Sequence, residues 1–233
     1  MKILTVIPAR KGSKGVPGKN KKILAGKPLI EYSFEIASKL PDNFYNLVST
    51  DDNEIIEISK NYEMNFNGLR PKKLSDDDSL TIDVLKYELN ETYKSTRISF
   101  DGILLLQPTC PFRKVDDILQ SYEIFSQNNN SSVVSVCDVG ANHPFRMKII
   151  DDGKLLNFYD QGFEDMRPRQ LLPNVYIRSG SIYMTSSENI RKGILVNDEV
   201  FPIITEGIYS INIDTLYDFY LAEKLFQDHK SSI

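Results

Sequence analysis

Runs of apolar residues alternate with amphipathic stretches along most of the chain, which is the pattern of an α/β protein. The apolar run 3–9 is rich in β-branched residues and ends in a loop of glycine, proline and lysine, as buried parallel strands do. The same reasoning predicts further strands at 46–50, 101–108, 131–139, 147–158, 174–185 and 208–213. Apolar positions at helical spacing predict helices at 28–40, 52–62, 81–94, 115–127 and 215–226.

This alternation predicts a mostly parallel, Rossmann-like sheet with helices on both faces, in a single domain over residues 1–233. Ligands of such folds bind beyond the carboxyl ends of the strands. The loops 10–20, 107–113 and 212–214 each follow a predicted strand end. We therefore expect these three loops to converge on one site.

Composition narrows the class of protein. Apolar residues make up 41% and charged residues 26%, and the net charge of -4 argues against a broad surface for nucleic acid. No stretch approaches the roughly 20 apolar residues of a spanning helix, and the first apolar run is too short for a signal peptide. The two cysteines suggest neither a disulfide framework nor a zinc site. We expect a cytoplasmic protein with no nucleic-acid or membrane partner, so an anionic substrate would need a local basic pocket.

The densest chemical signal is the loop that follows the first strand. Residues 10–22 contain six basic residues and three glycines. Glycines allow several backbone N–H groups to point at one anion, and arginine and lysine add the charge that a triphosphate requires. The spacing fits neither a Walker A motif nor a dinucleotide fingerprint. A solvated basic loop is the alternative, but glycines at this spacing after a buried strand favour polyphosphate binding.

Six motifs follow one another in order along almost the whole chain. The first runs from Ile7-Pro8-Ala9-Arg10 through Ser13-Lys14-Gly15 and Pro17-Gly18-Lys19-Asn20 to Gly26-Lys27-Pro28-Leu29-Ile30. The others lie at 69–76, 106–113, 167–170, 180–183 and 213–215. Together they resemble the motifs of the acylneuraminate cytidylyltransferases, although in the third motif Cys110 and Phe112 stand where that family usually has serine and leucine. The related CMP-Kdo synthetases share the Ile-Pro-Ala-Arg start but typically differ at Ser13-Lys14-Gly15 and Lys19-Asn20.

The resemblance implies a nucleotidyltransferase that moves CMP from CTP to the anomeric hydroxyl of an acidic nine-carbon sugar and releases pyrophosphate. The sugar would be N-acetylneuraminic acid or a relative such as legionaminic acid, and the motif around Gln107 favours these over pseudaminic acid. Such transfer depends on positioning and charge neutralisation. The implied catalytic residues are Arg10, Lys14 and Asp214. The implied CTP-binding residues are Arg10, Gly12, Ser13, Lys14, Lys19, Asn20, Arg70 and Thr81.

The resemblance also implies individual roles, with which the side-chain chemistry is compatible. Arg10 and Lys14 would meet the triphosphate, while Lys19 and Asn20 would lie near the cytosine, whose donor and acceptor pattern suits an asparagine amide. Arg70 would belong to the nucleotide site, although a surface arginine beside a turn fits equally well. Thr81 falls where the family has a hydroxyl that contacts the base, but it could equally be a helix N-cap.

The expected sugar site uses Gln107, Arg146, Arg169 and Tyr183. Gln107 follows a predicted strand, where a neutral amide can orient an acidic sugar without repelling its carboxylate. Arg146 and Arg169 have the planar fork that suits a carboxylate. Tyr183 could pack its ring on the sugar, and a position in the hydrophobic core is nearly as plausible for this side chain.

A divalent cation, Mg²⁺, is expected to accompany CTP. Asp214 is the main candidate ligand, and Asn212 stands where the family usually has a second aspartate. Alternate residues of a strand face one side, so both side chains could reach one ion. The uncharged amide would weaken the site, and Asp214 could instead cap the helix that follows.

Segment 186–207 breaks the regular pattern and resembles the region through which family members form homodimers. Its alternative is a local excursion packed on its own core. Two other functions remain open for the whole chain. One is CMP-Kdo synthesis, and the other is a regulatory, non-catalytic nucleotide-binding protein, which only Asn212 suggests.

Overall fold

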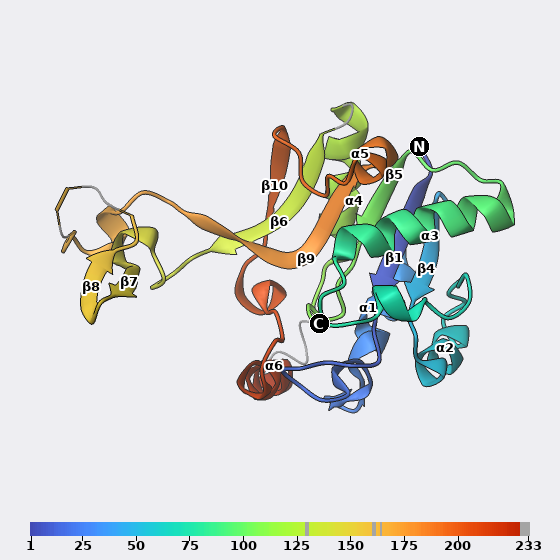
Figure 1. Cartoon of the computed structure of the whole chain (residues 1–233), viewed down its shortest axis with the longest axis horizontal. Helices are drawn as coiled ribbons and strands as arrows, with labels where there is room; N and C mark the ends of the chain where they lie inside the picture. Colours follow the sequence, from blue (N-terminus) through green and yellow to red (C-terminus); the bar gives the residue numbers. More distant parts are fainter. Residues whose placement is uncertain (129–130, 160–161, 164, 229–233) are drawn as a thin grey trace.

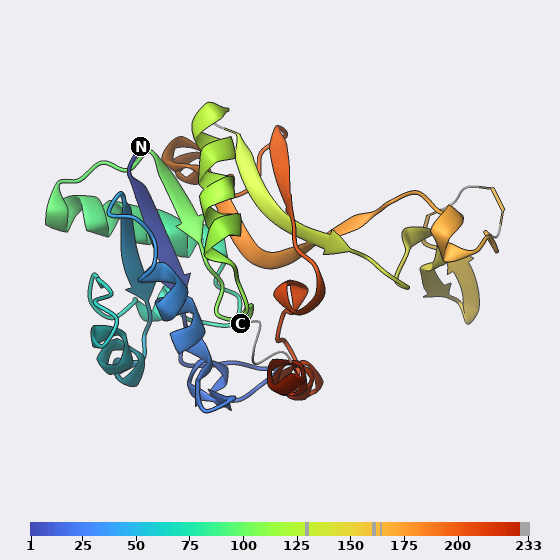
Figure 2. The same ribbon diagram turned by 180° about the vertical axis from the view of Figure 1, so that it is seen from behind.

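The computed structural model describes residues 1–128, 131–159, 162–163 and 165–228. Its centre is a six-stranded sheet in the order β10-β6-β9-β5-β1-β4 (Figures 1 and 2). The strands are β1 (Ile3–Pro8), β4 (Phe44–Ser49), β5 (Gly102–Leu105), β6 (Ser132–Asp138), β9 (Tyr176–Ser186) and β10 (Val200–Ile204). β1 is parallel to β4 and β5, β10 is parallel to β6, and β9 is antiparallel to both β5 and β6. The mostly parallel sheet is confirmed.

Helices cover both faces of this sheet, because β1 is apolar on both sides. Ile7 belongs to the same core cluster as Phe34, whereas its neighbour Val6 belongs to a second cluster with Leu85. The first face carries α1 (Leu29–Ala37), α2 (Asn53–Lys60) and α4 (Val115–Gln127), and the second carries α3 (Thr81–Thr96) and α5 (Ser187–Lys192). α3 lies across the front of the sheet in Figure 1, and α4 (yellow-green) lies in front of the opposite face in Figure 2.

Shorter elements connect these layers. They are β2 (Ile23–Leu24), β3 (Lys27–Pro28) and the 3₁₀ helices η1 (Lys19–Lys21), η2 (Lys72–Leu74), η3 (Pro144–Arg146), η4 (Arg169–Leu171) and η5 (Gly207–Ser210). The 3₁₀ helix η5 corrects the expected strand at 208–213. The apolar side chains there pack inward as a separate small cluster with α6 (Leu216–Asp228), so they do not pair with the sheet. Ile213 belongs to that cluster together with Phe112 and Phe219, and its burial there fixes the position of Asp214, the next residue.

A long arm, residues 139–175, leaves the sheet where β6 and β9 continue beyond it (Figure 1). At its end β7 (Lys148–Asp151) and β8 (Lys154–Asn157) form an antiparallel hairpin of their own. The strand expected at 147–158 is therefore a hairpin outside the main sheet.

We expected segment 186–207 to leave the regular pattern of strands and helices, and this expectation is wrong for its backbone. This segment forms α5 and then β10, which is paired with β6 at the edge of the main sheet. Leu195 and Val196 pack against the core cluster under α3 and α5. The part of the chain that departs from the sheet is the arm, and a role of 186–207 in dimerisation stays a prediction.

Candidate active site

The loop after β1 is tied down at the carboxyl end of the sheet. The Thr50 hydroxyl donates to the Ala9 carbonyl at 2.5 Å, and the Lys11 backbone N–H donates to the Asp51 carboxylate at 2.7 Å. Asn20 is buried, and its amide nitrogen donates to the Arg10 carbonyl at 3.0 Å. The glycine-rich loop is thus held at both ends by buried or short hydrogen bonds.

Gly15 brings this loop into direct contact with a segment about 200 residues later. A Cβ atom at Gly15 would lie 2.0 Å from the backbone oxygen of Asp214, which is far inside any real carbon–oxygen contact. Only glycine allows the two backbones to approach so closely. The first and last predicted motifs therefore meet in space.

A cavity of about 390 Å³ opens between these segments and the end of β5. Nine of the residues expected to bind CTP, sugar or metal line it: Arg10, Ser13, Lys14, Lys19, Asn20, Arg70, Thr81, Gln107 and Asp214. The expected convergence of the loops 10–20, 107–113 and 212–214 is confirmed. The sequence reasoning did not single out Asp76, Asp77, Ser79 and Thr109, which also line the cavity.

The basic side of the cavity is paired with an acidic side chain. Arg10 Nη1 lies 2.7 Å from Asp77 Oδ1, and Lys14 Nζ lies 3.1 Å from Asp77 Oδ2. The hydrogen bond from Lys14 is the main reason that the pKa of the Asp77 carboxyl is lowered from its ordinary value. Asp76 and Asp77 belong to an acidic run, which by itself predicts only an exposed loop.

Arg70 is buried, so its alternative reading as a surface arginine is wrong. Its Nε donates to the Ser75 hydroxyl at 3.2 Å and its Nη1 to the Ser49 hydroxyl at 3.5 Å. Ser49 in turn donates to the buried carboxylate of Glu88 at 2.6 Å. Burial lowers the pKa of Arg70 and raises the pKa of Glu88, because burial disfavours both charged forms. The attraction between the two opposite charges offsets part of that cost.

Thr81 is the first residue of α3, and Leu80 occupies the N-cap position before it. The N-cap reading of Thr81 is therefore wrong, and its side chain lines the cavity. In α2, by contrast, Asp52 is the N-cap and accepts a hydrogen bond from the Glu54 N–H.

Gln107 follows β5 and the buried Leu106, and it lines the cavity. Its backbone carbonyl accepts a short hydrogen bond from Nη2 of Arg113, and Nε of Arg113 donates to the Ser181 carbonyl at 2.8 Å. Arg113 is buried, and burial lowers its pKa to about 10. A methyl group at Gly180, which has φ +83°, would lie 3.1 Å from Gln107 Oε1. Arg113 thus fixes the backbone of Gln107, and the absence of a side chain at Gly180 leaves room for the Gln107 amide.

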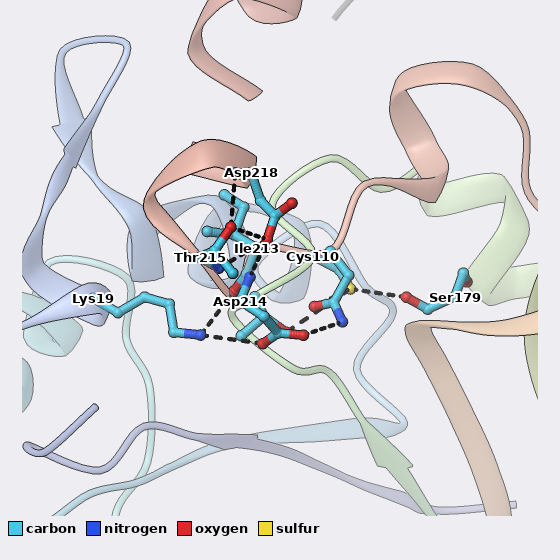
Figure 3. Close-up of polar contacts among 9 residues, drawn as sticks. Lys19, Cys110, Ser179, Ile213, Asp214, Thr215 and Asp218 are labelled. Carbon is cyan, nitrogen blue, oxygen red and sulfur yellow. Dashed lines mark hydrogen bonds and ion pairs between the residues drawn. The ribbon is translucent and has the colours of Figure 1, made fainter. Parts of the chain in front are cut away.

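Asp214 lies in a chain of polar contacts that Figure 3 shows. Lys19 Nζ donates to the Ile213 carbonyl at 2.7 Å and lies 3.3 Å from Asp214 Oδ1. Asn212 Nδ2 donates to Asp214 Oδ2 at 3.0 Å, while Asn212 Oδ1 lies 3.7 Å from the Cys110 sulfur. The Asp214 side chain therefore faces Lys19 and Asn212.

Thr215 and Asp218 form a capping box at the start of the last helix. The Thr215 hydroxyl accepts from the Asp218 N–H at 3.2 Å, and the Asp218 carboxylate accepts from the backbone N–H groups of Asp214 and Thr215 at 3.1 and 2.8 Å. Asp218 is labelled above Asp214 in Figure 3. The N-cap position considered for Asp214 therefore belongs to Thr215, with Asp218 as its partner inside the helix.

The structure does not bring five of the expected residues into the lining of this cavity: Gly12, Arg146, Arg169, Tyr183 and Asn212, which lies beside Asp214. Gly12 has no heavy atom within 4 Å of where its Cβ would be. Arg146 and Arg169 lie on the arm, where Arg146 donates to the Arg167 carbonyl at 2.8 Å and Arg169 lines a separate cavity of about 290 Å³. Tyr183 is buried in the core cluster under α3 and α5, so the core reading fits its position.

Oxygen ligands for a divalent cation are sparse in the described part of the chain, where no group of three or more acidic, histidine or cysteine side chains could hold a metal ion. Asp214 supplies one carboxylate at the cavity, and Asn212 turns its amide nitrogen toward that carboxylate. Mg²⁺ is commonly held by one or two carboxylates together with substrate phosphates. The residues fit an ion that arrives with a nucleotide.

Comparison with known proteins decides the family. Residues 4–160, well over half of the chain, match the cytidylyltransferase family. This chain belongs to the cytidylyltransferases. It is 34% identical over the full length of both chains to a CMP-N,N'-diacetyllegionaminic acid synthase from Legionella pneumophila. It is also 29% identical, again over both full lengths, to a pseudaminic acid cytidylyltransferase from Campylobacter jejuni.

Solved structures support the fold of this cytidylyltransferase. A CMP:2-keto-3-deoxy-manno-octonic acid synthetase complexed with CTP superimposes with a TM-score of 0.70 and covers 98% of this chain and 100% of its own, at 16% identity. At that identity the likeness concerns the fold alone. The cytidylyltransferase is an enzyme of the nucleotidyltransferase class, and no helix in its described residues has the length and apolar character needed to cross a bilayer.

Proposed function

We propose that this cytidylyltransferase transfers CMP from CTP to the anomeric hydroxyl of a nonulosonic acid and releases pyrophosphate. The observation that carries the proposal is the cavity that Arg10, Lys14, Gln107 and Asp214 line together. The full-length relatives named for legionaminic and pseudaminic acid support the class of sugar.

In this proposal, the phosphate tail of CTP binds Arg10 and Lys14, together with the loop at Gly12 and Ser13. Arg70, Thr81 and Asn20, which line the same cavity, would contact the nucleoside. The sugar hydroxyl oxygen forms a bond to the α-phosphorus, the bond to the β-phosphate breaks, and pyrophosphate leaves with the electron pair. The hydroxyl proton passes to solvent. Removing the charge of Lys14 should cost about 2–4 kcal/mol of transition-state stabilisation, as other electrostatic donors do.

We propose Mg²⁺ as the accompanying ion, held by Asp214 and by oxygens of the triphosphate. When bound, the ion would neutralise charge on the departing pyrophosphate. Lys19 already supplies one positive charge beside Asp214, and it would carry part of the charge neutralisation that an ion held by a single carboxylate leaves to the protein. Asn212 would orient Asp214 through its amide nitrogen, and only a flip of the amide would make its oxygen available.

The sugar is proposed to lie against Gln107, with an N,N'-diacetyllegionaminic type preferred on the strength of the 34% relative. Arg146 and Arg169 lie on the arm, away from the Gln107 cavity. They could reach a sugar only if an arm from another subunit covered the site.

That geometry supports a homodimer. The arm exposes large apolar side chains, among them Ile150 at 78% and Met166 at 82%. Exposed apolar surface of this kind usually marks an interface. An Ile150→Asp variant should sediment as a monomer, while Ile23→Asp, which alters an exposed isoleucine outside the arm, should not change the oligomeric state. Identical sedimentation of both variants and the parent chain would remove the arm from the interface.

A cytoplasmic location stays a prediction.

The test of the function is a sugar panel. Pyrophosphate release from CTP and Mg²⁺ would be measured with N,N'-diacetyllegionaminic, N-acetylneuraminic and pseudaminic acids and with Kdo. The proposal predicts sugar-dependent release, fastest in kcat/KM with the legionaminic acid, and strongly reduced release in a Lys14→Ala variant. Preference for Kdo would support CMP-Kdo synthesis instead. No release with any sugar, despite CTP binding, would support a regulatory nucleotide-binding protein.

A further inference from the structure

One carboxylate bridges the two side chains that the proposed function assigns to the phosphate tail. Asp77 presents one oxygen to Arg10 at 2.7 Å and the other to Lys14 at 3.1 Å. Asp77 lies in the turn between η2 and α3, whereas Arg10 and Lys14 lie in the loop after β1. The contact therefore joins two separate walls of the same cavity.

A carboxylate held in this way resembles one phosphate group in charge and in the placement of two oxygens. Arg10 and Lys14 bind carboxylate and phosphate oxygens with the same donors. These donors cannot hold Asp77 and a phosphate in the same geometry at once. An incoming phosphate tail must therefore break or weaken the Asp77 contacts.

The contacts are placed so that they can exchange. The Lys14 side chain is 73% exposed and the Asp77 side chain 40% exposed, so they can part by side-chain rotation at the surface. Ion pairs of this exposure contribute little individually and are screened by salt. A triphosphate, with more charge and more oxygens, can displace one carboxylate, while the carboxylate can compete with the smaller pyrophosphate.

We propose that Asp77 is an internal competitor for the phosphate site, which yields to CTP and returns to Arg10 and Lys14 as pyrophosphate leaves. This inference rests on the proposed assignment of Arg10 and Lys14 to the phosphates. Asp77 lowers the affinity for CTP somewhat and in exchange shortens the lifetime of the pyrophosphate complex. It acts on nucleotide affinity and product release and takes no part in the bond-making step.

The decisive comparison is Asp77→Asn against Asp78→Asn. Asp78 is an exposed aspartate of the same acidic run that does not line the cavity, so its variant makes the same change in net charge. The dissociation constants of pyrophosphate and CTP would be measured by calorimetry at low salt, together with the inhibition constant of pyrophosphate. We expect Asp77→Asn to tighten pyrophosphate and CTP binding by about threefold to tenfold, the range of two exposed ion pairs. Asp78→Asn should change either constant by less than about twofold.

Further variants separate the possible failures. Asp77→Glu keeps the carboxylate and should restore affinities close to those of the parent chain. Unchanged or weaker pyrophosphate binding in Asp77→Asn, with its melting temperature preserved, would overturn the inference. If Asp77→Asn fails in this way but Lys14→Ala weakens CTP binding in the same measurements, the assignment of Arg10 and Lys14 to the phosphates still holds. If Lys14→Ala leaves CTP binding unchanged, the phosphate assignment itself is wrong.

Discussion

Gly15→Ala offers the sharpest structural perturbation of the site. The new methyl carbon would lie 2.0 Å from the Asp214 carbonyl oxygen, whereas real Cβ atoms keep at least about 3.0 Å from such a neighbour. Because the obstacle is backbone, no side-chain rotation relieves the clash. The glycine loop and the segment at 213–214 must separate by about 1 Å.

The separation acts on the contacts that assemble the cavity. Lys19 Nζ bonds the Ile213 carbonyl at 2.7 Å, and a 1 Å shift would break that bond and move Lys14 away from Asp214. A displacement of this size in a transferase site can cost about 100-fold in rate, and overpacking costs about 1–3 kcal/mol in stability. We therefore expect kcat/KM for sugar-dependent pyrophosphate release to fall by at least about 100-fold. Urea unfolding would show the smaller loss of stability.

The control for stability is Gly12→Ala, the same substitution in the same loop with no heavy atom within 4 Å of the new carbon. It should unfold at the same urea concentration as the parent chain or at a slightly higher one. Full activity in Gly15→Ala would refute the reasoning, because the close approach of the two segments would then be unnecessary for transfer.

Three further predictions concern buried or paired polar groups. Burial raises the pKa of Glu88 above its ordinary value of 4.5, so the stability that its neutral form provides is lost as pH rises from about 4.5 through the folded-state pKa. Glu88→Gln should remove that pH dependence from urea unfolding between about pH 4 and pH 8, and an unchanged profile would contradict the assignment. Asn212→Asp would place a second carboxylate about 3.0 Å from that of Asp214, so its melting temperature should fall by about 2–4 °C without Mg²⁺ and rise more than the parent's when Mg²⁺ is added. An equal Mg²⁺ response in both proteins would mean that position 212 is remote from the ion. Asp218→Ala should lose about 1–2 kcal/mol of unfolding free energy as the capping box of α6 loses its carboxylate. Asp218→Asn, which keeps an acceptor oxygen, should lose less, and equal losses would argue against this role.

Much of the sheet was predictable because buried parallel strands are apolar on both faces. β1 and β5 show this as continuous runs, and α3 and α4 show helical spacing. β10 was missed because it is a short edge strand, half exposed and interrupted by Pro202, and such strands carry a weak pattern. The segment 208–213 had alternating apolar residues, but these pack into the cluster around α6. Alternation alone cannot distinguish pairing with a sheet from packing against a helix.

The site was predictable where its chemistry is written in unusual residues. The basic glycine loop identified Arg10 and Lys14, and the strand end identified Gln107, all of which line the cavity. Asp77 escaped notice because an acidic run ordinarily indicates a solvated surface. Whether Tyr183 faces ligand or core depends on the register of β9 against its neighbours, and the sequence does not fix that register.

A crystal structure with CTP and Mg²⁺ would test the central claim most directly. The account predicts the phosphate tail on Arg10 and Lys14, the base toward Arg70 and Thr81, and Asp77 turned away from both cations. A phosphate tail bound elsewhere, with Arg10 and Lys14 still paired to Asp77, would contradict it.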